Sequence, residues 1–259
     1  MRRNQCRNVA LALSLAPVLS VTAHSAELTG IFGLEYSQGE YGTNTTTRQW
    51  AAPFGVKYDT DFGYARASSA LISVNNVNPN AMGEALPCGN SSSANRDVQG
   101  LGDTNLSLMK HVHSDSSLQI DVGTKIKFAT GDVNKCLSTG KNDFSLQADA
   151  FKRIDTYGIF GTLGLTYKGK PEVGGQTINY RNPMYFSFGA SKSLENRDVV
   201  GFSFDYRDAL LDGRSSLQEL TIFGVHRVSS KFRLQPYLMR GFTSSSPAVG
   251  MGINALNTF

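Results

Sequence analysis

From residue 27 onward, the chain lacks any apolar run near the roughly 20 residues that a membrane-spanning helix requires. Its mean hydropathy is slightly negative, at −0.23. The sequence therefore excludes a helical membrane protein. The chain could cross a bilayer only as a closed β-barrel, because an open sheet edge would leave backbone groups without hydrogen-bond partners in lipid.

The chain also lacks a real excess of charge of one sign. It has 25 Lys and Arg residues against 21 Asp and Glu residues. Three of the basic residues, Arg2, Arg3 and Arg7, precede an apolar stretch over 9–21 and the small residues Ala23, Ser25 and Ala26. This layout predicts a secretory signal peptide over 1–26, cleaved on export, and one domain over 27–259. Without the signal the charges nearly cancel, which argues against a nucleic-acid partner.

Cysteine is scarce, with three in the chain. Cys6 lies in the predicted signal peptide, so the exported protein keeps Cys88 and Cys136. An even pair in an exported protein predicts a disulfide, worth about 3–4 kcal/mol in the chain-entropy model. Unpaired or metal-binding thiols are the alternative.

What the chain has in quantity is alternation of period two. In the stretch from Leu101 to Asp132, two alternating runs are joined by a short Ser/Asp turn. Successive strand side chains point to opposite faces, so each run forms a strand with one apolar and one polar face. About twelve such runs follow one another from Leu28 to Phe259, as in an outer-membrane barrel. The run Phe62 to Asn75 is the weakest, because Arg66 falls among apolar residues, and the run Leu217 to Val228 also alternates poorly.

The connections between the runs alternate in length. Short turns are expected near 59–62, 113–117, 154–157, 193–198 and 228–231. Longer loops are expected near 38–47, 76–103, 129–142, 169–179, 208–216 and 243–247. Aromatic residues recur near the ends of the apolar faces, as in interfacial girdles: Tyr36, Trp50, Tyr58, Tyr157, Tyr167 and Tyr206. We therefore predict an all-β fold, a single transmembrane antiparallel barrel of about twelve strands in a Gram-negative outer membrane, with short periplasmic turns and longer extracellular loops. A secreted β-sandwich is the alternative.

The last run ends in Phe259, after apolar residues at alternate positions from Val249. It resembles the C-terminal signal that the outer-membrane barrel assembly machinery binds, although Asn257 departs from the usual apolar residue. A second resemblance covers 100–132. Gly100-Leu101-Gly102-Asp103, the hairpin after it and the segment 127–132 resemble a family of outer-membrane transporters named for the meta-pathway of phenol degradation. The resemblance implies a barrel that passes small molecules.

The charged residues at the polar positions of the alternating runs form the candidate functional site. These residues are predicted to line the barrel interior: Glu35, Lys57, Asp121, Lys125, Lys127, Asp149, Arg153, Asp205, Arg207 and Arg233. Their charges could pair across the lumen and close it, or line a narrow wet pore. We favour an outer-membrane channel that passes small polar solutes by diffusion. Bases slightly outnumber acids among these residues, which favours anionic solutes, and the family resemblance implies aromatic solutes as further candidates. A closed structural or surface-interaction barrel is the alternative.

Neither an enzyme nor a cofactor is predicted. His111 and His113 are two residues apart on one face of a strand and could hold a metal, but no third ligand is evident. A barrel hydrolase would need a Ser or Asp beside a His in the outer leaflet, whereas the segment from His226 to Ser229 falls on the predicted periplasmic side. A lipid bilayer and small-molecule solutes are the expected partners.

Overall fold

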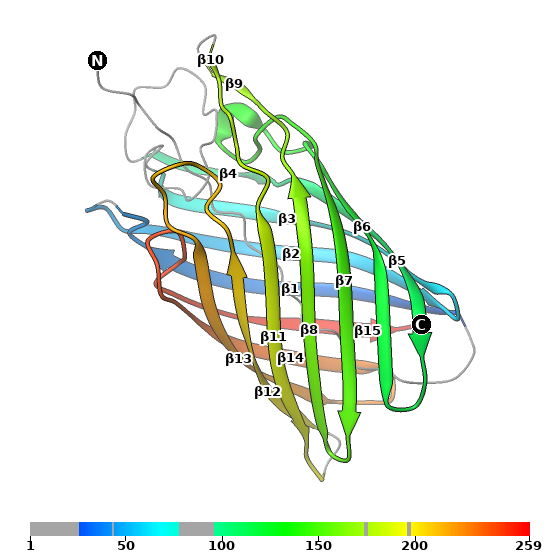
Figure 1. The fold of residues 1–259 in the computed structure, drawn as a ribbon. Helices are drawn as coiled ribbons and strands as arrows, with labels where there is room; N and C mark the ends of the chain where they lie inside the picture. The colour runs from blue at the N-terminus through cyan, green and yellow to red at the C-terminus, as the bar shows by residue number, and fades with distance from the viewer. Residues whose placement is uncertain (1–25, 43, 78–95, 174–175, 196–197) are drawn as a thin grey trace.

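The computed structural model describes residues 26–42, 44–77, 96–173, 176–195 and 198–259, and these form a barrel of tilted antiparallel strands (Figure 1). Within these ranges no helix has the length and hydropathy needed to cross a membrane. The strands are β1 (Glu27–Gly39), β2 (Thr47–Thr60), β3 (Gly63–Val77), β4 (Arg96–Leu101), β5 (Thr104–Ser114), β6 (Leu118–Phe128), β7 (Asp143–Ile154), β8 (Tyr157–Tyr167), β9 (Glu172–Val173), β10 (Gln176–Thr177), β11 (Met184–Ser193), β12 (Val199–Arg207), β13 (Leu217–Arg227), β14 (Phe232–Gly241) and β15 (Val249–Thr258). One 3-10 turn, η1 (Val133–Lys135), lies between β6 and β7.

Twelve strands close the barrel, because β1 pairs with both β2 and β15 and every other strand of the wall pairs with its sequence neighbours in it. The extra strand, β4, pairs with the C-terminal half of β3, while β5 pairs with the N-terminal half. Strands β4 and β5 therefore make one long wall strand that is interrupted at Gly102 and Asp103. The predicted fold class is confirmed, with the twelve strands expected from the alternation.

The alternation gives the wall two chemically different faces. Large apolar side chains of one parity point away from the barrel and are exposed in the isolated chain, for example Phe32 at 65% and Leu238 at 63%. So much exposed apolar surface would be unfavourable in water and is suited to lipid. The protein is thus an outer-membrane barrel, and the secreted sandwich is excluded by the closed single sheet.

Aromatic rings pair across neighbouring strands on this outer face. The ring centroids of Tyr36 and Trp50 are 4.9 Å apart, and those of Phe186 and Tyr206 are also 4.9 Å apart. Such cross-strand pairs stabilise a sheet, and amphipathic rings suit the membrane interface.

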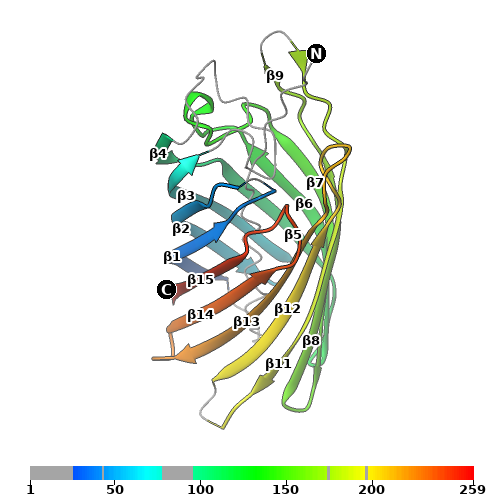
Figure 2. The same cartoon turned by 90° about the vertical axis from the view of Figure 1, so that its left-hand side faces the viewer.

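The short turns lie at one end of the barrel and the long loops at the other, as predicted (Figures 1 and 2). The start of β1 and the end of β15 both lie on the short-turn side. There Thr258 Oγ1 donates to Glu27 Oε1 at 3.2 Å, and Phe259 N donates to Leu28 O at 2.9 Å. Two expected loops contain strands. The prediction of a continuous loop over 76–103 was wrong, because this range contains β4. The predicted loop 169–179 contains the small hairpin of β9 and β10.

The two weak runs now have physical explanations. On β3 the residues Tyr64, Arg66 and Val74 share a parity because all three face the interior, where Val74 packs under loop residues. On β13 the inner face carries Phe223 and Val225 in an apolar cluster. Both inner faces are partly apolar, so the polar-in, apolar-out rule fails on them.

Candidate functional site: the barrel lumen

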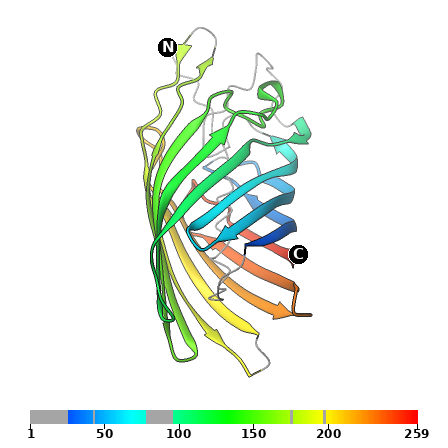
Figure 3. The ribbon, with the colours of Figure 1, turned by 90° about the vertical axis from the view of Figure 1, so that its right-hand side faces the viewer.

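The tilted strands surround the barrel interior from one end to the other (Figure 3). The inner face of these strands carries charged residues at several levels between the two ends. Strand positions put Lys127, Asp205 and Arg207 near the long-loop end and Lys57, Arg153 and Arg233 near the short-turn end. Arg153 is exposed at the rim, whereas Glu35, Asp121 and Asp205 are buried. Whether all ten predicted residues line an open pore remains a prediction.

Two inward carboxylates lie directly opposite each other on neighbouring strands, Asp121 on β6 and Asp149 on β7. Each accepts hydrogen bonds from side chains around it. Asp121 contacts His111 Nδ1 at 2.6 Å and Gln119 Nε2 at 2.9 Å. Asp149 accepts from Thr162 Oγ1 at 2.7 Å and from Gln147 Nε2 at 2.9 Å. These contacts hold two like charges side by side on the inner wall.

A second ionic group lies at the long-loop end. Lys127 Nζ is 2.9 Å from Asp103 Oδ2 and 3.3 Å from Asp143 Oδ2. Asp143 also contacts Lys168 Nζ at 2.7 Å. Lys127 further donates to Thr139 Oγ1 at 3.0 Å, so the network reaches into the loop 129–142. We call Asp103, Lys127, Asp143 and Lys168 the rim network.

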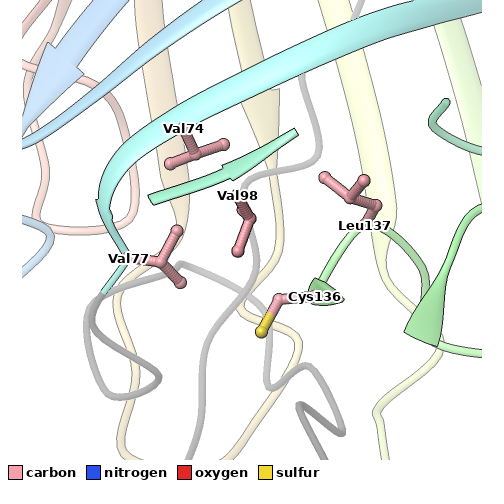
Figure 4. Close-up of a cluster of buried hydrophobic side chains, with 5 residues drawn as sticks. All are labelled: Val74, Val77, Val98, Cys136 and Leu137. Carbon is pink, nitrogen blue, oxygen red and sulfur yellow. The ribbon is translucent and has the colours of Figure 1, made fainter. Parts of the chain in front are cut away.

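The same loop is also held by apolar packing. Val74 and Val77 at the end of β3 and Val98 on β4 form a buried cluster with Cys136 and Leu137 (Figure 4). The loop 129–142 is therefore fixed against the inner side of β3 and β4 by packing, and against β6 and β7 by the rim network.

A third feature is a set of inner-face side chains that lie over glycines of the adjacent strand. A Cβ atom added to Gly164 would lie 2.2 Å from the Tyr185 ring, one at Gly189 would lie 2.4 Å from Phe160, and one at Gly252 would lie 2.7 Å from Tyr237. Strand pairing places each ring on the strand next to its glycine. The absent Cβ lets these rings lie flat against the wall instead of projecting into the lumen.

We expect Gly164→Ala to displace Tyr185 from the wall, because the three atoms nearest to the new methyl group all belong to that one side chain. The hydrogen bond from Tyr185 Oη to Gln147 Oε1, now 2.8 Å, should be lost. Unfolding in urea should show a loss of about 1 kcal/mol, the usual value of one hydrogen bond. In Gly224→Ala the nearest atom would be 3.8 Å away. Equal losses in the two variants would contradict this account.

Several of these residues escaped the sequence analysis. Arg66 was treated as a defect in its run, although it faces inward opposite Lys57. Asp143 and Lys168 lie at the junctions of strands and loops, where alternation gives no signal. Glu219 lies on the poorly alternating strand β13, opposite Asp205. Pairing across strands, rather than parity within one strand, would have found Arg66 and Glu219.

The expectation that His111 and His113 share one face of their strand was wrong. The pairing of β5 with β6 shifts between His111 and His113, so His111 lies opposite Asp121 while His113 lies opposite Ile120. The bulge separates the two rings, and His113 contacts Asp115 at 2.9 Å in the turn. Over the described ranges, no group of three potential ligands could hold a metal.

The residues of the hydrolase alternative lie at the short-turn end. His226 Nδ1 is 3.0 Å from Asp198 Oδ2, and this hydrogen bond is the main cause that lowers the pKa of Asp198 below its usual range. Ser229 Oγ accepts from the backbone nitrogens of Lys231 and Phe232. These contacts shape two neighbouring turns.

The predicted partner of Cys136, Cys88, lies outside the described residues, so the disulfide stays a prediction. Cys136 itself is 2% exposed. We expect protein from native membranes to run faster on non-reducing than on reducing electrophoresis after heating, because a disulfide would keep a loop closed in the unfolded chain. Thiol labelling of the unfolded protein provides the check: two labelled cysteines without a reductant would remove the bond.

Comparison with known proteins gives the fold but no family. No family profile and no curated protein matches the chain in sequence. Among solved structures, an outer membrane channel from Pseudomonas putida F1 superimposes with a TM-score of 0.69 at 12% identity, over 92% of this chain and 97% of the other. The NanC porin gives 0.54 at 7% identity, over 89% and 98%, and the KdgM porin 0.52 at 8% identity, over 89% and 99%. The chain thus has the fold of outer-membrane channels and porins.

Proposed function

We propose that the protein is an outer-membrane channel through which small polar solutes diffuse. The observation that carries this proposal is the charged inner face of a closed twelve-strand barrel. Barrels of about eight strands fill with side chains, whereas more strands leave room for a lumen. A purely structural barrel of this size would gain nothing from carrying Lys125, Asp149 and Asp205 on its inner face, where each charge must be solvated or paired.

Two further features support a channel. Glycines beneath the rings of Tyr185, Phe160 and Tyr237 keep bulky side chains against the wall. The solved structures with this fold are described as channels and porins. The resemblance of 100–132 to the transporter family named for phenol degradation points in the same direction, and membership of that family is part of the proposal. The proposal also includes export by the signal peptide over 1–26, and recognition by the assembly machinery of the strand that ends in Phe259.

Conductance of the purified protein in a planar lipid bilayer tests the proposal. A channel gives discrete, stable current steps that rise linearly with voltage. A protein that is folded, as shown by its heat-dependent migration on electrophoresis, and yet stays silent would favour the closed structural barrel and overturn the proposal.

A further inference from the structure

We propose that Arg66, Ser107 and Lys125 form an anion-binding site on the lumen wall, which takes the carboxylate group of a small organic acid during its passage. The inference rests on the proposed channel function and names the solute class. It depends on the position and pairing of these three residues rather than on the total charge of the lumen.

The register of three adjacent strands brings the residues together. Arg66 on β3 lies directly opposite Ser107 on β5, and Ser107 lies directly opposite Lys125 on β6. Directly opposed side chains have Cβ atoms about 5 Å apart and share one face of the sheet. Two cations therefore flank a hydroxyl group in one row of the inner wall.

Both cations are available to a ligand. Within the described part of the chain, neither Arg66 nor Lys125 lies within ion-pair distance of a carboxylate. Arg66 Nε is buried and has no hydrogen-bond partner there. A buried donor without a partner is unfavourable, and a ligand oxygen would satisfy it.

Among the described residues, the nearby carboxylates do not pair with Arg66 or Lys125. Asp149 lies on β7, next to the β6 strand that carries Lys125, and its oxygens already accept from Thr162, Gln147 and Tyr64. Asp121 is likewise held by its contacts with His111 and Gln119. Neutral or local donors thus occupy the carboxylates, which leaves the two cations free to bind an oxyanion.

The chemistry of the row fits a carboxylate. An arginine side chain presents parallel N–H groups that match the two oxygens of a carboxylate, and a lysine adds a second, more flexible cation. The Ser107 hydroxyl can donate one further hydrogen bond. A small carboxylate would meet all three groups from the lumen side.

The same row supplies a matched control. Lys57 on β2 lies directly opposite Arg66, but its Nζ is 2.6 Å from Asp59 Oδ1 and 4.3 Å from the Tyr64 ring centroid. Lys57→Gln removes the same formal charge from the same row as Lys125→Gln. It differs in removing a cation that already has a partner.

The test measures reversal potentials in a potassium chloride gradient and the block of chloride current by added acetate. We expect acetate to block the wild-type channel in a saturable way. Arg66→Gln and Lys125→Gln should each lower the chloride-to-potassium permeability ratio about threefold and weaken the acetate block, as expected for loss of one nearby charge. Ser107→Ala should weaken the acetate block, because it removes the hydroxyl group that donates to the carboxylate.

The outcomes separate this site from the channel proposal. No current from folded wild-type protein removes the channel function itself. Current without saturable acetate block, or equal effects of Lys57→Gln and Lys125→Gln, leaves the channel function intact and overturns the site. Heat-dependent migration of each variant on electrophoresis shows that it has folded, and Lys125→Gln provides the test if Arg66→Gln does not fold.

Discussion

Leu163→Arg should destabilise the barrel by about 2–4 kcal/mol, the cost of an arginine on the lipid face near the middle of the membrane. Leu163 lies on β8 between the outward aromatic residues Tyr157 and Tyr167 and is 53% exposed on the outer face. Urea unfolding in lipid vesicles, followed by the fluorescence of Trp50, the single tryptophan, measures the loss.

Two companion variants isolate the effect of the charge. Leu163→Ala removes the side chain without adding a charge. Ser187→Arg adds the same charge to the inner face of β11, where Ser187 lies opposite Thr162. We expect Ser187→Arg to cost much less than Leu163→Arg, because the lumen wall already carries charged groups. If the order of the two arginine variants is reversed, the assignment of faces is wrong.

Asp143→Ala should cost about 3–5 kcal/mol, because removing one member of a buried ionic network leaves uncompensated charge. Asp143 and Lys168 side chains are 7% and 6% exposed, and Asp143 also accepts from the backbone nitrogen of Gly169 at 2.9 Å. The loss would remove the Asp143 contact of both Lys127 and Lys168 at the rim. We expect faster proteolysis within the loop 129–142 as well as lower stability in urea.

An exposed ion pair serves as the control for Asp143→Ala. Asp212 is 3.8 Å from Arg181 and its side chain is 97% exposed. Exposed pairs contribute about 0–1 kcal/mol, so Asp212→Ala should leave unfolding and proteolysis nearly unchanged. Similar behaviour of the two variants would mean that the rim network does not stabilise the barrel.

The sequence predicted those parts of the fold that depend on one strand at a time. The faces of β6 and β8 followed from parity, because a two-residue period with lipid on one side fixes which side chains face outward. The short and long connections were also visible. Features that depend on register between strands were missed: the row of Arg66 and Lys125, the bulge beyond His111, and the rings over glycines. Register is fixed by all strand pairs together, and no single segment records it.

The pairing of β1 with β15 has a consequence for the order of folding. Every other pair in the barrel joins wall strands that follow one another along the chain, whereas β1 and β15 are the first and the last of them. Their residues Thr29 and Thr258 bring Oγ1 atoms to 3.5 Å across 229 residues of chain. Hairpins can form from local contacts, but closure must wait until both ends of the sheet exist, and the entropy of closing so long a loop opposes it. Until then β1 and β15 are open edges that can pair with other chains. A chain that ends before β15 should therefore fold its hairpins and aggregate through the free edge of β1.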